Sequence, residues 1–397
     1  MRISGLRALE VLDSRGMPTL KVSMNVDGAP GEFYVPAGAS TGKAEAAELR
    51  DGGTRYGGKG VRKAAVRVLA LGGRIHRASF KNQAEFDALL DEEELAGNVS
   101  LGLSGAFARG SAAAQGLPLY EIFGEGRSLP RPMVNLISGG LHGGNNIPIQ
   151  DILVVPMAAK SFAESVELVW RVYRAAGELL AKKYDYNPHW VADEGGYAPR
   201  FKSVEEALDL TVEAIVEAGL KPGVSMSICL DVAASHGAGI TIETLEKWAA
   251  GWPIFSIEDG VPEDDWEGWR TLTRELGRIQ LIGDDFFATN PERLRRGIRE
   301  SCANAVLVKM NQIGTITKTL EVIAIAKEAG YRTVVSARSG ETEDSTMSDL
   351  AVGSDAGQIK IGSITRSERL AKYNRLLEIE AQLNNPHTRR MRPPSKG

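Results

Sequence analysis

The spacing of apolar residues changes along the chain, and this change predicts two domains. Every second residue from Leu20 to Val26 is apolar, which predicts a strand, and residues 61–72 and 99–115 have helical periodicity. We therefore expect an N-terminal α+β domain over residues 1–126. Two nearby prolines in the segment Leu129–Met133 oppose a continuing helix and predict a linker.

Beyond this linker, over residues 127–397, short β-branched runs alternate with longer amphipathic stretches. The runs are Ile152–Pro156, Met226–Asp231, Pro253–Glu258, Ile279–Asp284, Ala305–Lys309, Arg332–Ser336 and Gln358–Ile361. Helical periods lie between or after them at 162–182, 203–218, 316–329 and 366–383. A strand followed by a helix, repeated this often, predicts an α/β fold in which a parallel sheet closes into a (β/α)8 barrel.

Several of the predicted strands end in, contain or are closely followed by a charged residue. These residues are Asp231, Glu258, Asp284, Lys309, Lys360 and Arg338. The carboxyl ends of barrel strands meet at one mouth, so side chains that are far apart in the sequence are expected to face a common pocket. This mouth is the predicted active site.

Three of the charged residues, Asp231, Glu258 and Asp284, are carboxylates from successive predicted strands. Three acids in one mouth would repel one another and have raised pKa values unless a cation lay among them. Oxygen ligands without a flanking His or Cys favour magnesium or manganese over zinc. The alternative is that each acid caps the helix that follows its strand.

The next predicted strands supply Lys309 and Lys360. A lysine that is partly desolvated near other cations loses basicity and can act as a general base. The alternative is a surface lysine whose stem covers the barrel rim.

Three loop segments add further candidates. Arg338, within Ser336–Thr342, could bind a phosphate or phosphonate through two parallel hydrogen bonds, or could instead pair with a surface acid. Glu194 could serve as an acid, because the two glycines after it permit close backbone approach. Gly38–Gly42 is a loop with two hydroxyls, and by itself it is equally consistent with a plain turn.

Composition excludes several function classes. The 47 basic and 51 acidic residues give a net charge of −4, and the basic residues are spread along the chain, so no nucleic-acid partner is expected. No apolar run is long enough to span a bilayer, no signal peptide opens the chain, and the cytoplasm is the expected location. The two cysteines, Cys229 and Cys302, lie in or beside apolar runs and indicate neither a disulfide framework nor a zinc site.

The chain resembles the enolase family, phosphopyruvate hydratase, over nearly its whole length. The matching stretches are Leu12–Thr19, Gly38–Gly42, Gly116–Tyr120, Asp193–Pro199, Ser256–Gly260, Gly283–Asp285, Lys309–Gly314, Arg338–Asp344 and Gly357–Ser363. Many motifs in the same order make the resemblance specific. It implies an enolase-type barrel whose first two units are irregular, magnesium as cofactor, a small phosphorylated or phosphonylated carboxylic acid as substrate, and a homodimer.

The resemblance also implies a role for each matching residue. Asp231, Glu258 and Asp284 match the ligands of a first magnesium, and Ser40 matches a ligand of a second one that joins in the substrate complex. Lys309 matches the base that removes the proton beside the substrate carboxylate, a mechanism long described for this superfamily. The remaining matches are Lys360 for the carboxylate, Arg338 and Ser339 for the phosphate, Glu194 for the acid at the leaving hydroxyl, and His142 for a closing loop.

Two departures fall on the side where the family places the leaving hydroxyl. The family's Gln-Glu pair is Gln150-Asp151 here, and its Ser-His-Arg-Ser is Ser336-Ala337-Arg338-Ser339. We still expect Gln150 to contact the substrate and Asp151 to take part in catalysis, although one methylene and one imidazole are lost. His236, in the short connection 233–240, could replace that imidazole or be an ordinary loop residue.

Loss of a positioned acid or base typically lowers a rate by about 10² to 10⁴. The sequence therefore predicts a specialised paralogue that acts on a phosphonate or phosphinate analogue of 2-phosphoglycerate, similar to carboxyphosphonoenolpyruvate synthases of antibiotic pathways. Two alternatives stay open. One is an authentic enolase that converts 2-phosphoglycerate to phosphoenolpyruvate, and the other is a non-catalytic binding protein with the same fold.

Overall fold

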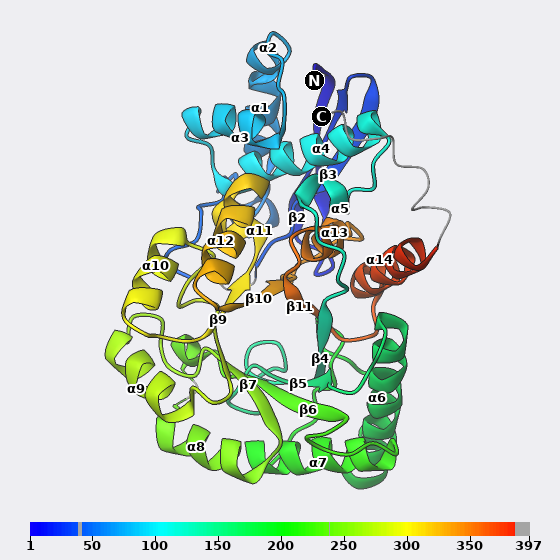
Figure 1. Cartoon of the computed structure of the whole chain (residues 1–397), viewed down its shortest axis with the longest axis vertical. Helices are drawn as coiled ribbons and strands as arrows, with labels where there is room; N and C mark the ends of the chain where they lie inside the picture. Colours follow the sequence, from blue (N-terminus) through cyan, green and yellow to red (C-terminus); the bar gives the residue numbers. More distant parts are fainter. Residues whose placement is uncertain (39–41, 238, 386–397) are drawn as a thin grey trace.

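A small antiparallel sheet with its helices lies at one end of the molecule, and a closed barrel lies at the other (Figure 1). This computed structural model describes residues 1–38, 42–237 and 239–385. Ser40, which the sequence proposes as a metal ligand, lies outside the described residues.

The N-terminal part is a three-stranded sheet covered by helices. Its strands are β1 (Ile3–Leu12), β2 (Pro18–Val26) and β3 (Ala29–Tyr34), paired in the order β1-β2-β3. Its helices are η1 (Arg55–Gly58), α1 (Arg62–Ala70), α2 (Gly72–Ile75), α3 (Gln83–Glu92), α4 (Gly97–Gln115) and α5 (Tyr120–Phe123). The predicted strand and the predicted helix at 99–115 are confirmed, and the predicted helix at 61–72 is nearly all helical but divides between α1 and α2 at Leu71.

The barrel consists of eight strands in sequence order. They are β4 (Arg131–Ser138), β5 (Asp151–Pro156), β6 (Met226–Asp231), β7 (Ile254–Glu258), β8 (Gln280–Gly283), β9 (Ala305–Val308), β10 (Arg332–Ser336) and β11 (Gly357–Gly362). The outer helices are α6 (Phe162–Tyr184), α7 (Val204–Glu217), α8 (Ile242–Gly251), α9 (Trp266–Leu276), α10 (Pro291–Arg299), α12 (Ile316–Glu328), α13 (Thr346–Gly353) and α14 (Ser367–Asn384). Two single turns, η2 (Ala234–His236) and α11 (Met310–Ile313), follow β6 and β9. The predicted enolase-type α/β barrel is confirmed.

Two details of the predicted barrel are wrong. The segment Leu129–Met133 is a linker only up to Pro130, because β4 begins at Arg131 and contains Pro132; proline opposes a helix but is compatible with the first residues of a strand. The sheet is also not the fully parallel one that the periodicity predicted, since β5 is antiparallel to both β4 and β6. This agrees with the irregular first two units that the resemblance implied. A loop without a helix joins β4 to β5, and two helices join β5 to β6, so each connection reverses the strand direction.

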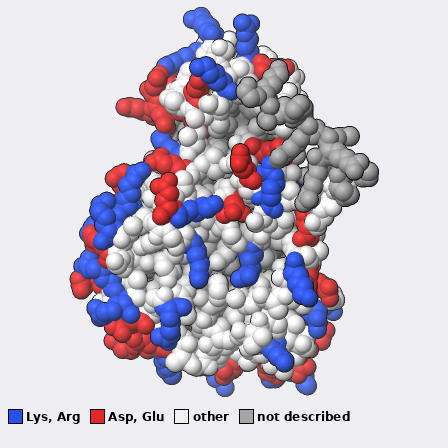
Figure 2. Space-filling view, in the orientation of Figure 1, with Lys and Arg blue, Asp and Glu red and all other residues white. Residues whose placement is uncertain are grey.

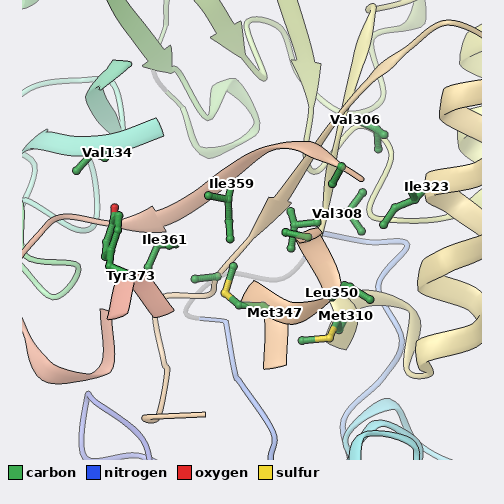
Figure 3. Packing of buried hydrophobic residues seen from close by; sticks show 14 of the residues in the cluster. Val134, Val306, Val308, Met310, Ile323, Met347, Leu350, Ile359, Ile361 and Tyr373 are labelled. Carbon is green, nitrogen blue, oxygen red and sulfur yellow. The ribbon is translucent and has the colours of Figure 1, made fainter. Parts of the chain in front are cut away.

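The interior and the outer face of the barrel have separate apolar cores. Side chains from most of the strands fill the interior: Met133, Leu153, Val155, Cys229, Ile282, Ala305, Leu307 and Val334. The alternate residues belong to the outer core: Figure 3 shows Val308 and Ile359 toward Met347 and Leu350 of α13, and Val306 near Ile323 of α12. The strands are therefore packed on both faces, which gives their carboxyl ends a rigid base.

Charged side chains of both signs are interspersed over the face seen in Figure 2, without one dominant basic area. Within the described residues, no helix combines the length and the apolar character that crossing a membrane would require. Both cysteines are buried free thiols, in line with the sequence interpretation. The domain boundary near residue 127 stays a proposal.

We expect Gly31→Ala to destabilise the protein strongly, because β3 contacts α4 without room for a side chain. A Cβ atom at Gly31 would lie 2.2 Å from the carbonyl oxygen of Ala106 and 2.3 Å from the amide nitrogen of Gly110. Forced overpacking costs about 1–3 kcal/mol or more. Urea unfolding should show this loss, whereas the control Gly251→Ala, where no atom lies within 4 Å, should stay within about 1 kcal/mol of the parent.

Candidate functional site

A cavity opens at the carboxyl ends of the barrel strands. Most of the residues predicted for the site line it: His142, Gln150, Asp151, Glu194, Asp231, Asp284, Lys309, Arg338, Ser339 and Lys360. Glu258 lies beneath Lys360 instead, and Ser40 is outside the described residues. The structure thus brings together residues from eight separate segments of the sequence.

Strand register places the carboxylates side by side. Asp151 is the Cα partner of Asp231, and Asp231 is the Cα partner of Glu258. Asp284 directly follows the next strand, β8. All four are buried, and burial together with the charge of Asp231 raises the pKa of Glu258 well above its usual range.

Lys360 binds two of these acids at once. Its Nζ donates to Oδ2 of Asp231 at 2.7 Å and to both carboxylate oxygens of Glu258 at 2.7 and 2.8 Å. Gln150 Nε2 also donates to Oδ2 of Asp231, at 2.9 Å. Asp231 and Glu258 therefore converge on one positive group.

Lys309 pairs with the third acid. Its Nζ donates to Oδ2 of Asp284 at 2.5 Å, and Gln312 Nε2 donates to Oδ1 of the same carboxylate at 3.2 Å. Burial alone would raise the pKa of Asp284, but the positive charge of Lys309 lowers it overall.

Neither lysine has the lowered basicity expected from the sequence. Burial would lower the pKa of Lys309, yet the charge of Asp284 outweighs burial and raises it. For the same reason, Asp231 and Glu258 raise the pKa of Lys360 well above its usual range. The sequence argument considered neighbouring cations, whereas the nearest charged groups here are carboxylates. Both side chains are largely buried, so the alternative of surface lysines is wrong.

The alternative of helix-capping acids is also wrong. The helices that follow these strands are capped by other residues, namely Thr241 for α8, Asp265 for α9 and Asn290 for α10. The three acids are therefore free of local capping roles and instead bind lysines inside the mouth.

A second group of carboxylates, which shares Asp284 with the first, lies close together in the structure. Asp259, Asp284 and Asp285 each have a ligand atom within 4.8 Å of the others. Asp259, however, accepts the backbone N–H of Asp284 at 2.9 Å and that of Asp285 at 2.8 Å, one on each oxygen. We interpret Asp259 as the residue that shapes this turn, because each of its oxygens accepts a backbone N–H from it.

Arg338 reaches the cavity from β10 but is shared with the N-terminal sheet region. Its Nη1 donates to Oε2 of Glu45 at 3.0 Å and to Oδ1 of Asn311 at 2.9 Å, and its Nη2 donates to Oε1 of Glu45 at 3.2 Å. Arg338 thus has an acid partner, but the alternative of a surface acid is wrong, because the side chain of Glu45 is buried. Contact of Arg338 with a phosphorus group stays a prediction. Sequence reasoning missed Glu45, which lies 293 positions away.

Asp151 and Glu194 belong to the wall at which the resemblance places the leaving group. Asn135 Nδ2 donates to Oδ1 of Asp151 at 2.6 Å, and burial and the charge of Glu194 raise the pKa of Asp151 well above its usual range. Gly195, with φ of 91°, and Gly196 let the Glu194 loop approach Asn135; a Cβ at Gly196 would lie 2.6 Å from its Oδ1. The expected use of these two glycines is confirmed.

His142 links two loops over this wall. Its Nδ1 is 3.0 Å from Oδ1 of Asp193 and 3.8 Å from Oε1 of Glu194. Burial would lower the pKa of His142, but the hydrogen bond to Asp193 and the charges of Glu194 and Asp151 raise it to about 9. The ring is therefore mainly an imidazolium at neutral pH.

Ala337 and His236 both line the cavity, but His236 is already engaged. Its Nε2 is 3.1 Å from Oδ2 of Asp285. Whether this ring replaces the imidazole that Ala337 lacks stays a prediction.

The donor set fits a hard divalent cation. Asp231, Glu258 and Asp284 offer only carboxylate oxygens, which is the ligand type of magnesium. The first two already share one ammonium nitrogen, and a second ammonium neutralises the third. The three carboxylates therefore stabilise positive charge in this part of the mouth.

We expect Mg²⁺ to bind at these acids and to stabilise the fold. At a concentration one hundred times Kd, binding to the folded state alone adds about 3 kcal/mol to the free energy of unfolding. Asp231→Asn and Glu258→Gln should weaken binding at least tenfold in isothermal titration calorimetry. Asp209→Asn, an exposed acid on α7, should bind as the parent does. Unchanged affinity in both site variants would contradict the assignment.

We expect the contribution of His142 to stability to depend on pH. Its folded pKa, about 9, is above the ordinary histidine value of 6.5, so the stabilisation is complete below pH 6.5 and is lost as the pH rises through 9. The free energy of unfolding lost in His142→Gln should be larger at pH 6 than at pH 9.5, by up to about 3 kcal/mol. NMR titration of the ring in Asp193→Asn should show a lower pKa than in the parent. An equal loss at both pH values would refute this prediction.

Comparison with known families agrees with the geometry. A family model described as the enolase N-terminal domain matches residues 3–123. A second model, described as the enolase C-terminal TIM barrel domain, matches residues 126–240 and 238–389. These matches cover nearly the whole chain, and the chain belongs to the enolase family.

Proposed function

We propose that this protein is a magnesium-dependent carbon–oxygen lyase specialised for a phosphonate or phosphinate analogue of 2-phosphoglycerate. It removes the proton beside the substrate carboxylate and expels a group from the next carbon, which leaves an enolpyruvate product. The observation that carries the proposal is the composition of the cavity. Lys309, Lys360 and Arg338 are gathered there, while Asp151 and Ala337 occupy the positions where the family has a longer acid and an imidazole.

Lys309 is the proposed base. Its side chain lines the cavity, is largely buried and is fixed by the hydrogen bond from Nζ to Asp284. It must be neutral to accept a proton, and its pairing with Asp284 opposes this. Magnesium, when bound at the three acids, supplies positive charge that competes with both lysines for the carboxylates and stabilises the second negative charge on the substrate carboxylate.

Lys360 and Arg338 are the proposed anion contacts. Lys360 is the ammonium group nearest Asp231 and Glu258, and in the proposal it faces the substrate carboxylate, where negative charge develops. Arg338, held by Glu45 and Asn311, offers a fixed guanidinium to the phosphorus group, together with Ser339. Gln150, which holds Asp231, completes the proposed substrate contacts.

Asp151, Glu194 and His142 are the proposed groups on the leaving-group wall. The raised pKa of Asp151 favours a neutral carboxyl, which has a proton to give, and the charged His142 is a second donor. Ala337 has neither a proton nor a hydrogen-bonding atom. The leaving-group wall thus keeps two carboxyl groups. It has more space and fewer hydrogen-bond donors than the family pattern, in which Glu and His stand at positions 151 and 337. This supports a substrate that differs from 2-phosphoglycerate.

The proposal can be tested with magnesium and 2-phosphoglycerate, by following the ultraviolet absorbance of the enol product. We expect turnover at least about 10² below that of the double variant Asp151→Glu/Ala337→His, which restores both groups of the family pattern. Lys309→Met should abolish turnover in either background, which separates enzyme activity from contaminants.

Each other outcome favours an alternative function. Turnover of 2-phosphoglycerate by the parent at ordinary enolase rates would establish an authentic enolase. Failure to bind magnesium in the presence of a phosphorylated hydroxy acid would favour a non-catalytic binder. A cytoplasmic homodimer is part of the proposal, and the mass of the protein in solution tests the dimer.

A further inference from the structure

Arg369, on the first turn of α14, is a fully buried arginine beneath the cavity. Its Nη1 donates to the backbone oxygen of Arg338 at 2.6 Å and to that of Ile361 at 3.1 Å. Its Nη2 donates to the backbone oxygen of Ser339 at 2.7 Å. One guanidinium therefore holds the backbone at the ends of β10 and β11, including both residues proposed for the phosphorus group.

The burial of this charge is energetically expensive. Its ion pair, with Oε1 of Glu368 on the same helix, is 3.6 Å long, and its close partners are neutral carbonyl oxygens. A well-packed apolar side chain is often as stable as a buried charge or more so. Overall stability is therefore a weak explanation for this arginine, and the three carbonyl groups that it fixes are a better one.

The segment after β10 depends on α14 in a second way. Lys372, also fully buried, pairs with Oε2 of Glu341 at 3.0 Å and donates to the backbone oxygen of Thr342. Oε1 of Glu341 accepts the backbone N–H of Arg338 at 3.0 Å. Residues 338–342 are thus held from below by two buried cations of one helix.

The same helix also supports the end of β11 and, through it, the Glu194 loop. The hydroxyl of Tyr373 donates to the backbone oxygen of Gly362 at 3.0 Å, and the next residue, Ser363, donates its backbone N–H to the oxygen of Glu194 at 2.9 Å. Figure 3 shows Tyr373 near Ile361 and Val134. The helix that carries Arg369 therefore supports both the segment after β10 and the end of β11, which contacts the Glu194 loop.

We propose that Arg369 is a positioning residue that fixes the backbone of Arg338 and Ser339, so that their groups meet a bound phosphoryl or phosphonyl oxygen in one geometry. The naming of that anion rests on the proposed function, but the positioning does not. Lysine in the same place keeps the charge, yet its single ammonium group cannot reproduce the planar fork that spans three carbonyls. The conservative substitution is therefore the informative one.

Hydrogen exchange tests the positioning without any ligand. In Arg369→Lys, amides of the peptide covering 336–344 should exchange about tenfold faster or more, as expected when charge-assisted hydrogen bonds are lost. The matched control is Arg375→Lys, because Arg375 lies on the same helix but binds Asp349 of α13. In the control this peptide should exchange as in the parent. Parental exchange in Arg369→Lys would overturn the proposal.

A measurement on the unaltered chain applies even if Arg369→Lys does not fold. The amides of residues 338–342 and those of residues 369–373 should exchange through the same opening reaction, because opening of one segment breaks the hydrogen bonds that hold the other. The two segments should therefore have the same opening free energy and the same dependence of that free energy on urea. Separate openings would overturn the proposal.

Ligand binding then separates this inference from the proposed function. With magnesium present, Arg369→Lys should raise the Kd for 2-phosphoglycerate and for inorganic phosphate about tenfold, and Arg375→Lys should leave both unchanged. A parent that binds neither anion would refute the proposed function, and hydrogen exchange would still decide the role of Arg369. Parental affinity in Arg369→Lys would overturn that role.

Discussion

The structure depends on the balance of charge inside the barrel mouth. Asp231 and Glu258 share Lys360, and Asp284 binds Lys309. Each of these groups is buried, and an unpaired buried charge would cost several kcal/mol. The mouth therefore forms only if the barrel closes, because Lys360 of β11 reaches Asp231 of β6 and Glu258 of β7, which are not its neighbouring strands. Asp284 and Lys309, in contrast, follow the neighbouring strands β8 and β9. This requirement ties the chemistry of the site directly to the closure of the barrel.

Both parts of the chain contribute to that balance. Glu45, from the segment after β3, accepts hydrogen bonds from Arg338 and from Gln312, and Gln312 also donates to Asp284. The N-terminal part is thus connected through two side chains to the acid beside Lys309. Glu45 and Gln312 thus form a continuous set of hydrogen bonds from Arg338 to Asp284. The buried Arg369 below β10 and β11 keeps this arrangement in register.

The sequence predicted much of this site because the carboxyl ends of barrel strands lie close together, even when the strands are far apart in the sequence. Two things were enough to predict five of the residues: the periodicity of the chain, and the rule that the carboxyl ends of barrel strands meet at one mouth. These residues are Asp231, Glu258, Asp284, Lys309 and Lys360. The reversed strand β5 was not predictable from its run of apolar residues, because such a run gives the position of a strand and not its direction. The partners Glu45, Gln312 and Asn135 were missed for a related reason. They are polar residues without periodicity, and only tertiary contacts show what they bind.

The two departures from the family fall where they disturb the charge balance least. The side chain of Asp151 is bound by Asn135 and not by either lysine, and Ala337 carries no charge. The chain has Asp151 where the family has Glu, and Ala337 where the family has His. These two differences leave every carboxylate–lysine pair in place. Variation of the leaving-group wall is therefore compatible with a stable mouth, whereas variation of Lys360 or Glu258 would leave a buried charge without its partner. The change of substrate that we propose is therefore compatible with an unaltered set of ion pairs around Lys309 and Lys360.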